Sequence, residues 1–81
     1  MNLDGFQPIH QSNLQPGVTY YLRTRFGSGY VLAKEDLGIK GWSVELQLGA
    51  EFSPPPSQKK MRNGCQMTVP VGEGQFYEPK V

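Results

Sequence analysis

Apolar and polar residues alternate along several stretches of the chain, and this alternation is the main structural signal of the sequence. Between residues 18 and 26, one parity carries Val18, Tyr20, Leu22 and Phe26, and the other carries Thr19, Tyr21, Arg23 and Arg25. Successive side chains of an extended chain point to opposite faces, so the first group faces one side and the second group the other. The stretch therefore predicts a β-strand with one buried face.

A hairpin is expected directly after this strand. Gly27-Ser28-Gly29 interrupts the pattern, and a second β-prone run begins at Tyr30. A two-residue loop and a three-residue loop place Tyr30 on opposite faces of the sheet, and the sequence allows both. We expect the three-residue loop, with Gly29 in the left-handed conformation, which pairs Phe26 with Tyr30 on the inner face.

A third strand is predicted over residues 42–48, where the alternation is unbroken. Its expected inner face carries Trp42, Val44, Leu46 and Leu48. We expect the first three of these to form one continuous core with Val18, Tyr20 and Leu22, because the two most regular strands must bury their apolar faces against something. Further on, Asn63-Gly64 is typical of a two-residue hairpin turn, here between an arm at residues 58–62 and a return strand that buries Cys65 and Met67.

Two shorter strands are predicted near the ends of the chain. Residues 6–9 contain Pro8, which has no N–H to donate, so they indicate an edge strand or an extended arm. Gln75-Phe76-Tyr77 predicts a last short strand that ends before Pro79.

The composition agrees with short strands joined by many turns. The chain has ten glycines and seven prolines, spread without a period, and no window shows the 3.6-residue apolar pattern of a helix. We expect an all-β fold of about five or six short strands, either a small antiparallel barrel of the SH3-like or OB-like kind or a two-layer sandwich. It would form a single domain over residues 1–81, frayed at residues 1–5 and 79–81.

One short phrase resembles a known structural device. The order of Leu14, Pro16, Gly17, Tyr20 and Leu22 resembles the entry to a late strand of fibronectin type III domains, where a tyrosine hydroxyl bonds to the backbone just upstream. The strands that precede this corner in that family do not fit into the chain before Leu14. The resemblance therefore implies only the local device, with the Tyr20 hydroxyl bonded to a backbone group between Leu14 and Gly17.

Charge and cysteine content limit the classes of function. Eight Lys and Arg against seven Asp and Glu give a formal charge of +1, which provides no overall field for nucleic acid or an anionic membrane. A single cysteine, no signal-like first segment and no apolar run of about 20 residues predict a soluble, cytoplasmic protein. A single core in a chain this short is small, so we also expect self-association as a homodimer.

Two groups of residues are candidates for binding. Tyr21, Arg23 and Arg25 share the predicted outer face of the first strand, an arrangement by which small β-folds hold single-stranded nucleic acid. Lys59, Lys60 and Arg62 form the only basic cluster in the sequence, which would contact phosphates or an acidic protein surface. Either group also fits an ordinary solvent-exposed face or an edge strand protected by charge.

No residue pattern indicates catalysis, a metal or a cofactor. His10 has no second ligand at metal-binding spacing, and the glycine-rich turns precede no helix that would present N–H groups to phosphate. We therefore expect a non-catalytic binding module, a small stand-alone accessory or inhibitor protein of the phage or mobile-element type that docks onto a protein. The alternative is a β-barrel nucleic-acid binder that uses both candidate groups, and an enzyme whose site forms between subunits is a third interpretation.

Overall fold

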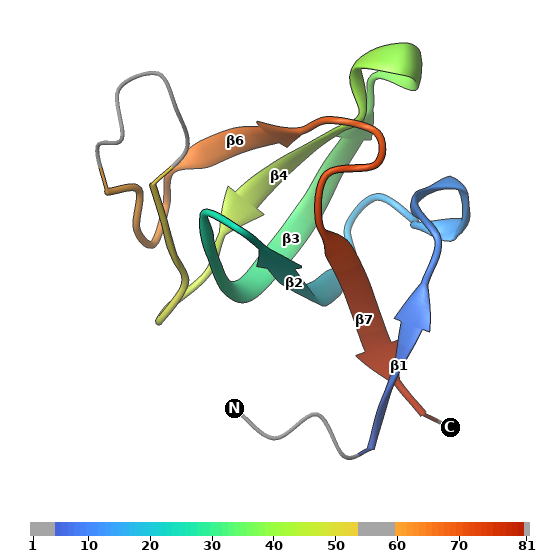
Figure 1. Cartoon of the computed structure of the whole chain (residues 1–81), viewed down its shortest axis with the longest axis horizontal. Coiled ribbons are helices and arrows are strands. Elements are labelled where there is room, and N and C mark those ends of the chain that lie inside the picture. Colours follow the sequence, from blue (N-terminus) through green and yellow to red (C-terminus); the bar gives the residue numbers. More distant parts are fainter. Residues whose placement is uncertain (1–4, 54–59, 81) are drawn as a thin grey trace.

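The computed structural model describes residues 5–53 and 60–80 and shows one antiparallel sheet with no α-helix in that part of the chain (Figure 1). The strands are β1 (Phe6–Ile9), β2 (Thr19–Thr24), β3 (Gly27–Asp36), β4 (Trp42–Leu46), β5 (Glu51–Phe52), β6 (Gln66–Val69) and β7 (Gln75–Pro79). Two single-turn 3-10 helices, η1 (Gln11–Asn13) and η2 (Gly38–Lys40), lie between them. The prediction of an all-β fold is confirmed. Neither of these helices is long or apolar enough to cross a membrane.

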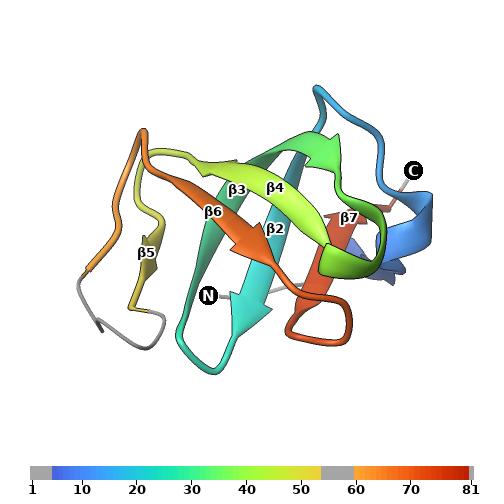
Figure 2. The same cartoon turned by 90° about the horizontal axis from the view of Figure 1, so that it is seen from above.

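The strands follow the order β1-β7-β2-β3-β4-β6, with β5 paired to the start of β3. The sheet curls, so that β4 and β6 lie over β2 and β7 while β3 joins the two parts (Figure 2). The strands β1 and β6 end the path and do not pair with each other, so the sheet is not closed. The fold is thus an open, curled sheet rather than a closed barrel.

The core lies on the concave face of this sheet. Its members are alternating apolar residues of the strands together with two loop residues, one before β2 and one before β5: Leu14, Tyr20, Leu22, Val31, Ala33, Trp42, Val44, Leu46, Ala50, Phe52, Val69 and Phe76. Five of the six residues predicted to form one continuous core are present. Val18 is the exception, since it precedes β2 and is 40% exposed. The prediction that Leu48 lies on the inner face is also wrong, because Leu48 lies in the turn after β4 and is 84% exposed.

The β2–β3 hairpin has a two-residue loop, so the predicted three-residue loop is wrong. Thr24 pairs with Gly27, which leaves Arg25 and Phe26 as the loop and places Tyr21 opposite Tyr30. This register moves Tyr30 from the predicted inner face to the outer face.

The reason for this register is the close approach of β5. Gly27 and Gly29 belong to β3 with φ angles of 148° and 149°, a region that glycine adopts readily and other residues rarely. A Cβ on Gly27 would collide with the carbonyl oxygen of Glu51, and a Cβ on Gly29 with the backbone of Ala50. The two glycines therefore allow the chain at residues 50–52 to lie against β3, whereas the sequence suggested that they form the loop.

The second half of the chain also departs from its predicted pairing. The turn at Asn63-Gly64 is present, but β6 pairs with β4 instead of with the chain before the turn. In the described part of that arm, Met61 forms a bridge to Phe52. Cys65 precedes β6 and is exposed, contrary to the prediction that it is buried, while Met67 is half-buried against the core.

The device at Tyr20 is confirmed. The Gln15 N–H donates to the Tyr20 hydroxyl at 3.0 Å, and the tyrosine is 4% exposed. The predicted edge strand is also confirmed, because β1 pairs only with β7 among the described residues.

Candidate functional site

Four aromatic side chains gather on the outer face of the sheet, opposite the core. Tyr21 is at the centre, because the register places it opposite both Tyr30 and Tyr77. Its ring centroid lies 5.3 Å from that of Tyr30, 6.4 Å from that of Tyr77 and 6.5 Å from that of Phe6. Tyr21 is only 5% exposed. The outward direction predicted for Tyr21 is therefore correct, but its neighbours cover it, and it supports this surface more than it offers contact area.

A hollow of about 290 Å³ lies beside this aromatic cluster. We call it the tyrosine hollow; it is lined by Tyr21, Ser28, Gly29, Tyr30, Leu48 and Gly49. The Gln47 N–H donates to the Tyr30 carbonyl at 3.0 Å, which holds the turn that carries Leu48 next to β3. Leu48 is 84% exposed and Tyr30 is 36% exposed, so two apolar side chains border the hollow and face solvent.

Arg23 lies on the same outer face. It is directly opposite Ser28, one of the residues that line the tyrosine hollow. Arg23 is exposed, and no carboxylate of residues 5–53 or 60–80 is within ion-pair distance of it. This guanidinium is available to a carboxylate or a phosphate of a ligand.

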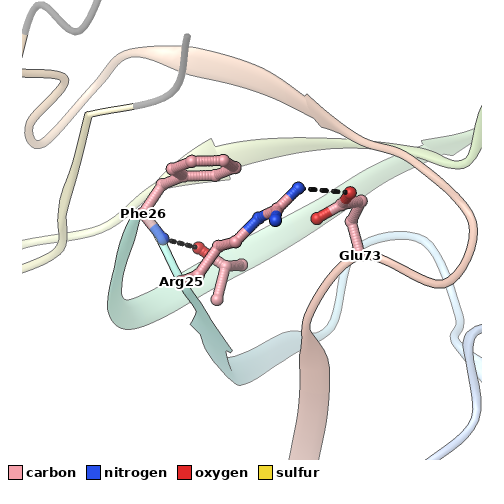
Figure 3. Close-up of polar contacts among 4 residues, drawn as sticks. Arg25, Phe26 and Glu73 are labelled. Atoms are coloured by element: carbon pink, nitrogen blue, oxygen red, sulfur yellow. Dashed lines mark hydrogen bonds and ion pairs between the residues drawn. The ribbon is translucent and has the colours of Figure 1, made fainter.

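Arg25 belongs to a different side of the molecule. Its guanidinium contacts Glu73 at 3.3 Å and lies 4.9 Å from the ring centre of Phe26 (Figure 3). These residues border a second hollow of about 260 Å³, which lies between the β2–β3 loop and β6. We call it the β6 groove; its lining is Thr24, Arg25, Phe26, Phe52, Met67, Thr68, Val69, Pro70 and Glu73.

The predicted basic cluster occupies a third place, next to β5. Lys60 and Arg62 both contact the carboxylate of Glu51, at 3.2 Å and 3.7 Å, and Lys59 lies outside the described residues. The predicted binding residues are therefore distributed over three surfaces: Tyr21 and Arg23 share one, Arg25 lies on a second, and Lys60 and Arg62 share the third.

His10 has a local structural role. Its Nδ1 accepts a hydrogen bond from the Ser12 N–H at 3.1 Å, which caps η1. In the part of the chain that the structure describes, no group of three or more His, Cys, Asp or Glu side chains is arranged to hold a metal ion.

The sequence did not indicate that Tyr30 and Leu48 are surface residues around one hollow. Both carried the parity of the expected core, and the alternation alone assigned them inward. Tyr21 was placed on the outer face, but no pattern in the sequence links it to Tyr77 and Phe6, because their proximity depends on the strand order.

Comparison with models of protein families, with curated proteins and with solved structures found no match for this chain.

Proposed function

We propose that this protein is a non-catalytic binding module that docks onto a protein partner through the tyrosine hollow and Arg23. One observation carries the proposal: Leu48 and Tyr30 are exposed apolar side chains that border a hollow, which the buried Tyr21 also lines. Exposed apolar groups around a preformed hollow are typical of interaction sites.

The residue types at this site suit a protein interface. Tyrosine and arginine are enriched at interfaces and among the residues that contribute most to binding. Tyr21 packs edge to face against Tyr30, with an interplanar angle of 73°, so the aromatic surface is held in place before a partner arrives. A surface that is already ordered loses less conformational entropy on binding.

These features specify the chemistry of the partner. An apolar side chain of the partner would enter the tyrosine hollow, and a carboxylate would pair with Arg23, for which the described residues provide no anion. We therefore propose a partner segment in which an apolar residue is followed closely by Asp or Glu.

Nucleic-acid binding is the alternative, and it has less support. Arg25, Lys60 and Arg62 already contact carboxylates, so phosphates would have to displace these partners. Tyr21 is covered by other rings and offers no open face for base stacking. Protein docking uses the groups that are exposed and unpaired in the described structure.

The cellular role that we propose is that of a small cytoplasmic accessory or inhibitor protein. The size of the chain supports the role by analogy only. Cys65 is an exposed free thiol, and free thiols persist in reducing compartments.

Capture from a lysate of the source cell, with and without nuclease, tests the proposal. Wild type is compared with Leu48→Asp, which places a charge at the hollow, and with the control Ile39→Asp. Ile39 is 96% exposed and lies in η2, before β4, whereas Leu48 lies after β4. We expect the same protein to be captured by wild type and Ile39→Asp with either nuclease treatment, and to be lost with Leu48→Asp.

Two results would contradict the proposal. Equal capture by both variants would show that the tyrosine hollow is not the docking site. Capture that disappears with nuclease and falls steeply with salt would favour the nucleic-acid alternative.

A further inference from the structure

We propose that two copies of the chain form a two-fold dimer in which β6 of one copy pairs with β6 of the other. This inference goes beyond the proposed function and uses a different surface of the molecule. It rests on the open edge of β6, on the direction of the backbone groups along that edge, and on the neighbouring β6 groove.

The two end strands of the sheet differ in how their edges are protected. In β1, the hydrogen bond from the Lys80 N–H to the Gly5 carbonyl and the β1–β7 register direct the backbone of Phe6 and Pro8 away from β7. Pro8 has no N–H, so this outward edge lacks a donor at its centre. β1 is therefore a poor template for a further strand.

β6 has no such protection. The Leu46 N–H donates to the Cys65 carbonyl at 2.8 Å, and in an antiparallel pair the bonded positions alternate. Met67 and Val69 then face β4 with their backbone groups, while Gln66 and Thr68 direct an N–H and a C=O to the open side. None of the four residues of β6 is charged or proline, and no other strand of the described chain covers this edge.

A second copy related by a two-fold axis matches this edge. If the axis passes next to Met67, Gln66 of each copy lies opposite Thr68 of the other. The two residues of each such pair exchange both backbone hydrogen bonds, which uses every outward N–H and C=O of Gln66 and Thr68. Because a two-fold axis makes adjacent copies of one strand antiparallel, the edge is complementary to itself without any change of conformation.

The same arrangement covers the β6 groove. In the two-fold register, Met67 of one copy lies opposite Met67 of the other on the concave side of the sheet. Met67 lines the groove together with Phe26 and Phe52, so the methionine of the second copy extends over an apolar hollow that a single copy leaves open. The second copy thus supplies a side chain to this hollow.

Paired charge variants test the register by sedimentation analysis across the micromolar range. In Gln66→Lys/Thr68→Lys, each lysine faces a lysine of the other copy, and we expect about tenfold weaker dimerisation, since like charges directly opposite each other oppose strand pairing. In Gln66→Lys/Thr68→Glu, each lysine faces a glutamate, and we expect dimerisation at least as tight as in wild type. A strictly monomeric wild type, or equal behaviour of the two variants, would overturn the proposal.

Cysteine cross-linking gives a second measurement that does not depend on the charge variants. In a Cys65→Ser background, Met67→Cys should form a disulfide-linked dimer on mild oxidation, because directly opposite residues of a non-bonded pair are about 4.5 Å apart at Cα. Thr68→Cys should not, since the two copies of residue 68 are more than about 7 Å apart in this register. Cross-linking at position 68 instead of 67 would refute the two-fold register.

The mass of the Leu48→Asp variant separates this inference from the docking function. Leu48→Asp should leave the dimer mass unchanged, because Leu48 does not line the β6 groove. A monomeric protein that still loses its partner on Leu48→Asp would overturn the dimer and leave the docking site intact. If Met67→Cys cross-links only to a different protein, the edge serves another partner and the dimer proposal fails.

Discussion

Removal of the Tyr20 hydroxyl should lower the stability of the protein measurably. The hydroxyl accepts the Gln15 N–H at 3.0 Å, and Tyr20→Phe removes this acceptor without changing the ring that packs edge to face on Phe76. A hydrogen bond of this kind contributes about 0.5–1.5 kcal/mol net. The bond is only partly buried and Gln15 is an exposed residue, so we expect less than the full cost of a completely buried unpaired donor. We therefore expect a loss of about 1 kcal/mol.

Thermal and urea unfolding of Tyr20→Phe and Tyr21→Phe measure this effect. A loss of about 1 kcal/mol corresponds to about 4–8 °C in the midpoint for a domain of this size. The control Tyr21→Phe should stay within about 0.5 kcal/mol of wild type, because no hydrogen bond to its hydroxyl is present in the described structure. All variants are compared at one protein concentration, since self-association shifts the midpoint. A larger loss for Tyr21→Phe than for Tyr20→Phe would refute the assignment of the bond and of the two faces of β2.

Three further predictions concern stability and are checked by the same unfolding assays. Leu46→Ala should cost about 2–5 kcal/mol, because Leu46 is fully buried in the core; a loss below about 0.5 kcal/mol would reject this packing. Gly41→Ala should cost more than Gly38→Ala, although both have positive φ angles of 104° and 69°, because a Cβ on Gly41 meets backbone at the end of β6 and one on Gly38 meets open space. Glu73→Gln should change stability by less than about 1 kcal/mol, since its ion pair with Arg25 is exposed; a larger loss would show that this contact helps to hold the β2–β3 loop against the turn before β7.

The strands could be predicted from the sequence where alternation runs through a whole strand. Trp42, Val44 and Leu46 are all buried as their spacing indicated, because alternate side chains of a strand point to the same face, and one face of this strand packs on the core. The prediction failed at the ends of such runs. Leu48 continues the alternation of β4 but lies beyond the last residue of the strand, and periodicity does not show where pairing stops.

The hairpin register could not be predicted, because its cause lies elsewhere in the chain. Two glycines next to a turn suggest a glycine loop, and only the position of β5 shows that they are needed inside β3. β5 itself has two residues, too short for any periodic signal. Since a shift of one residue exchanges the faces of a strand, this local error also hid the position of Tyr30.

The predicted binding residues were chosen by type, and type alone does not show whether a charge is already paired. Arg23 and Arg25 have the same parity in the sequence, yet Arg25 contacts Glu73 in the turn before β7, while Arg23 faces solvent beside Ser28. The distance along the chain between residues 25 and 73 explains why this pairing has no sequence signal. The two residues continue the antiparallel register of β2 and β7, in which Arg23 pairs with Gln75, so the pairing of these two strands brings them together (Figure 3).

The outer aromatic cluster has a structural role that restricts which of its members can be used to study binding. Phe6 packs against both Tyr21 and Tyr30, so these contacts fasten the edge strand β1 to the sheet. Removing the Tyr21 ring, as in Tyr21→Ala, would therefore lower stability and binding together, and the result would not separate the two roles. Leu48 borders the same hollow and is 84% exposed, which leaves little packing to lose. Binding energy and folding energy are thus separable at Leu48 and inseparable at the ring of Tyr21.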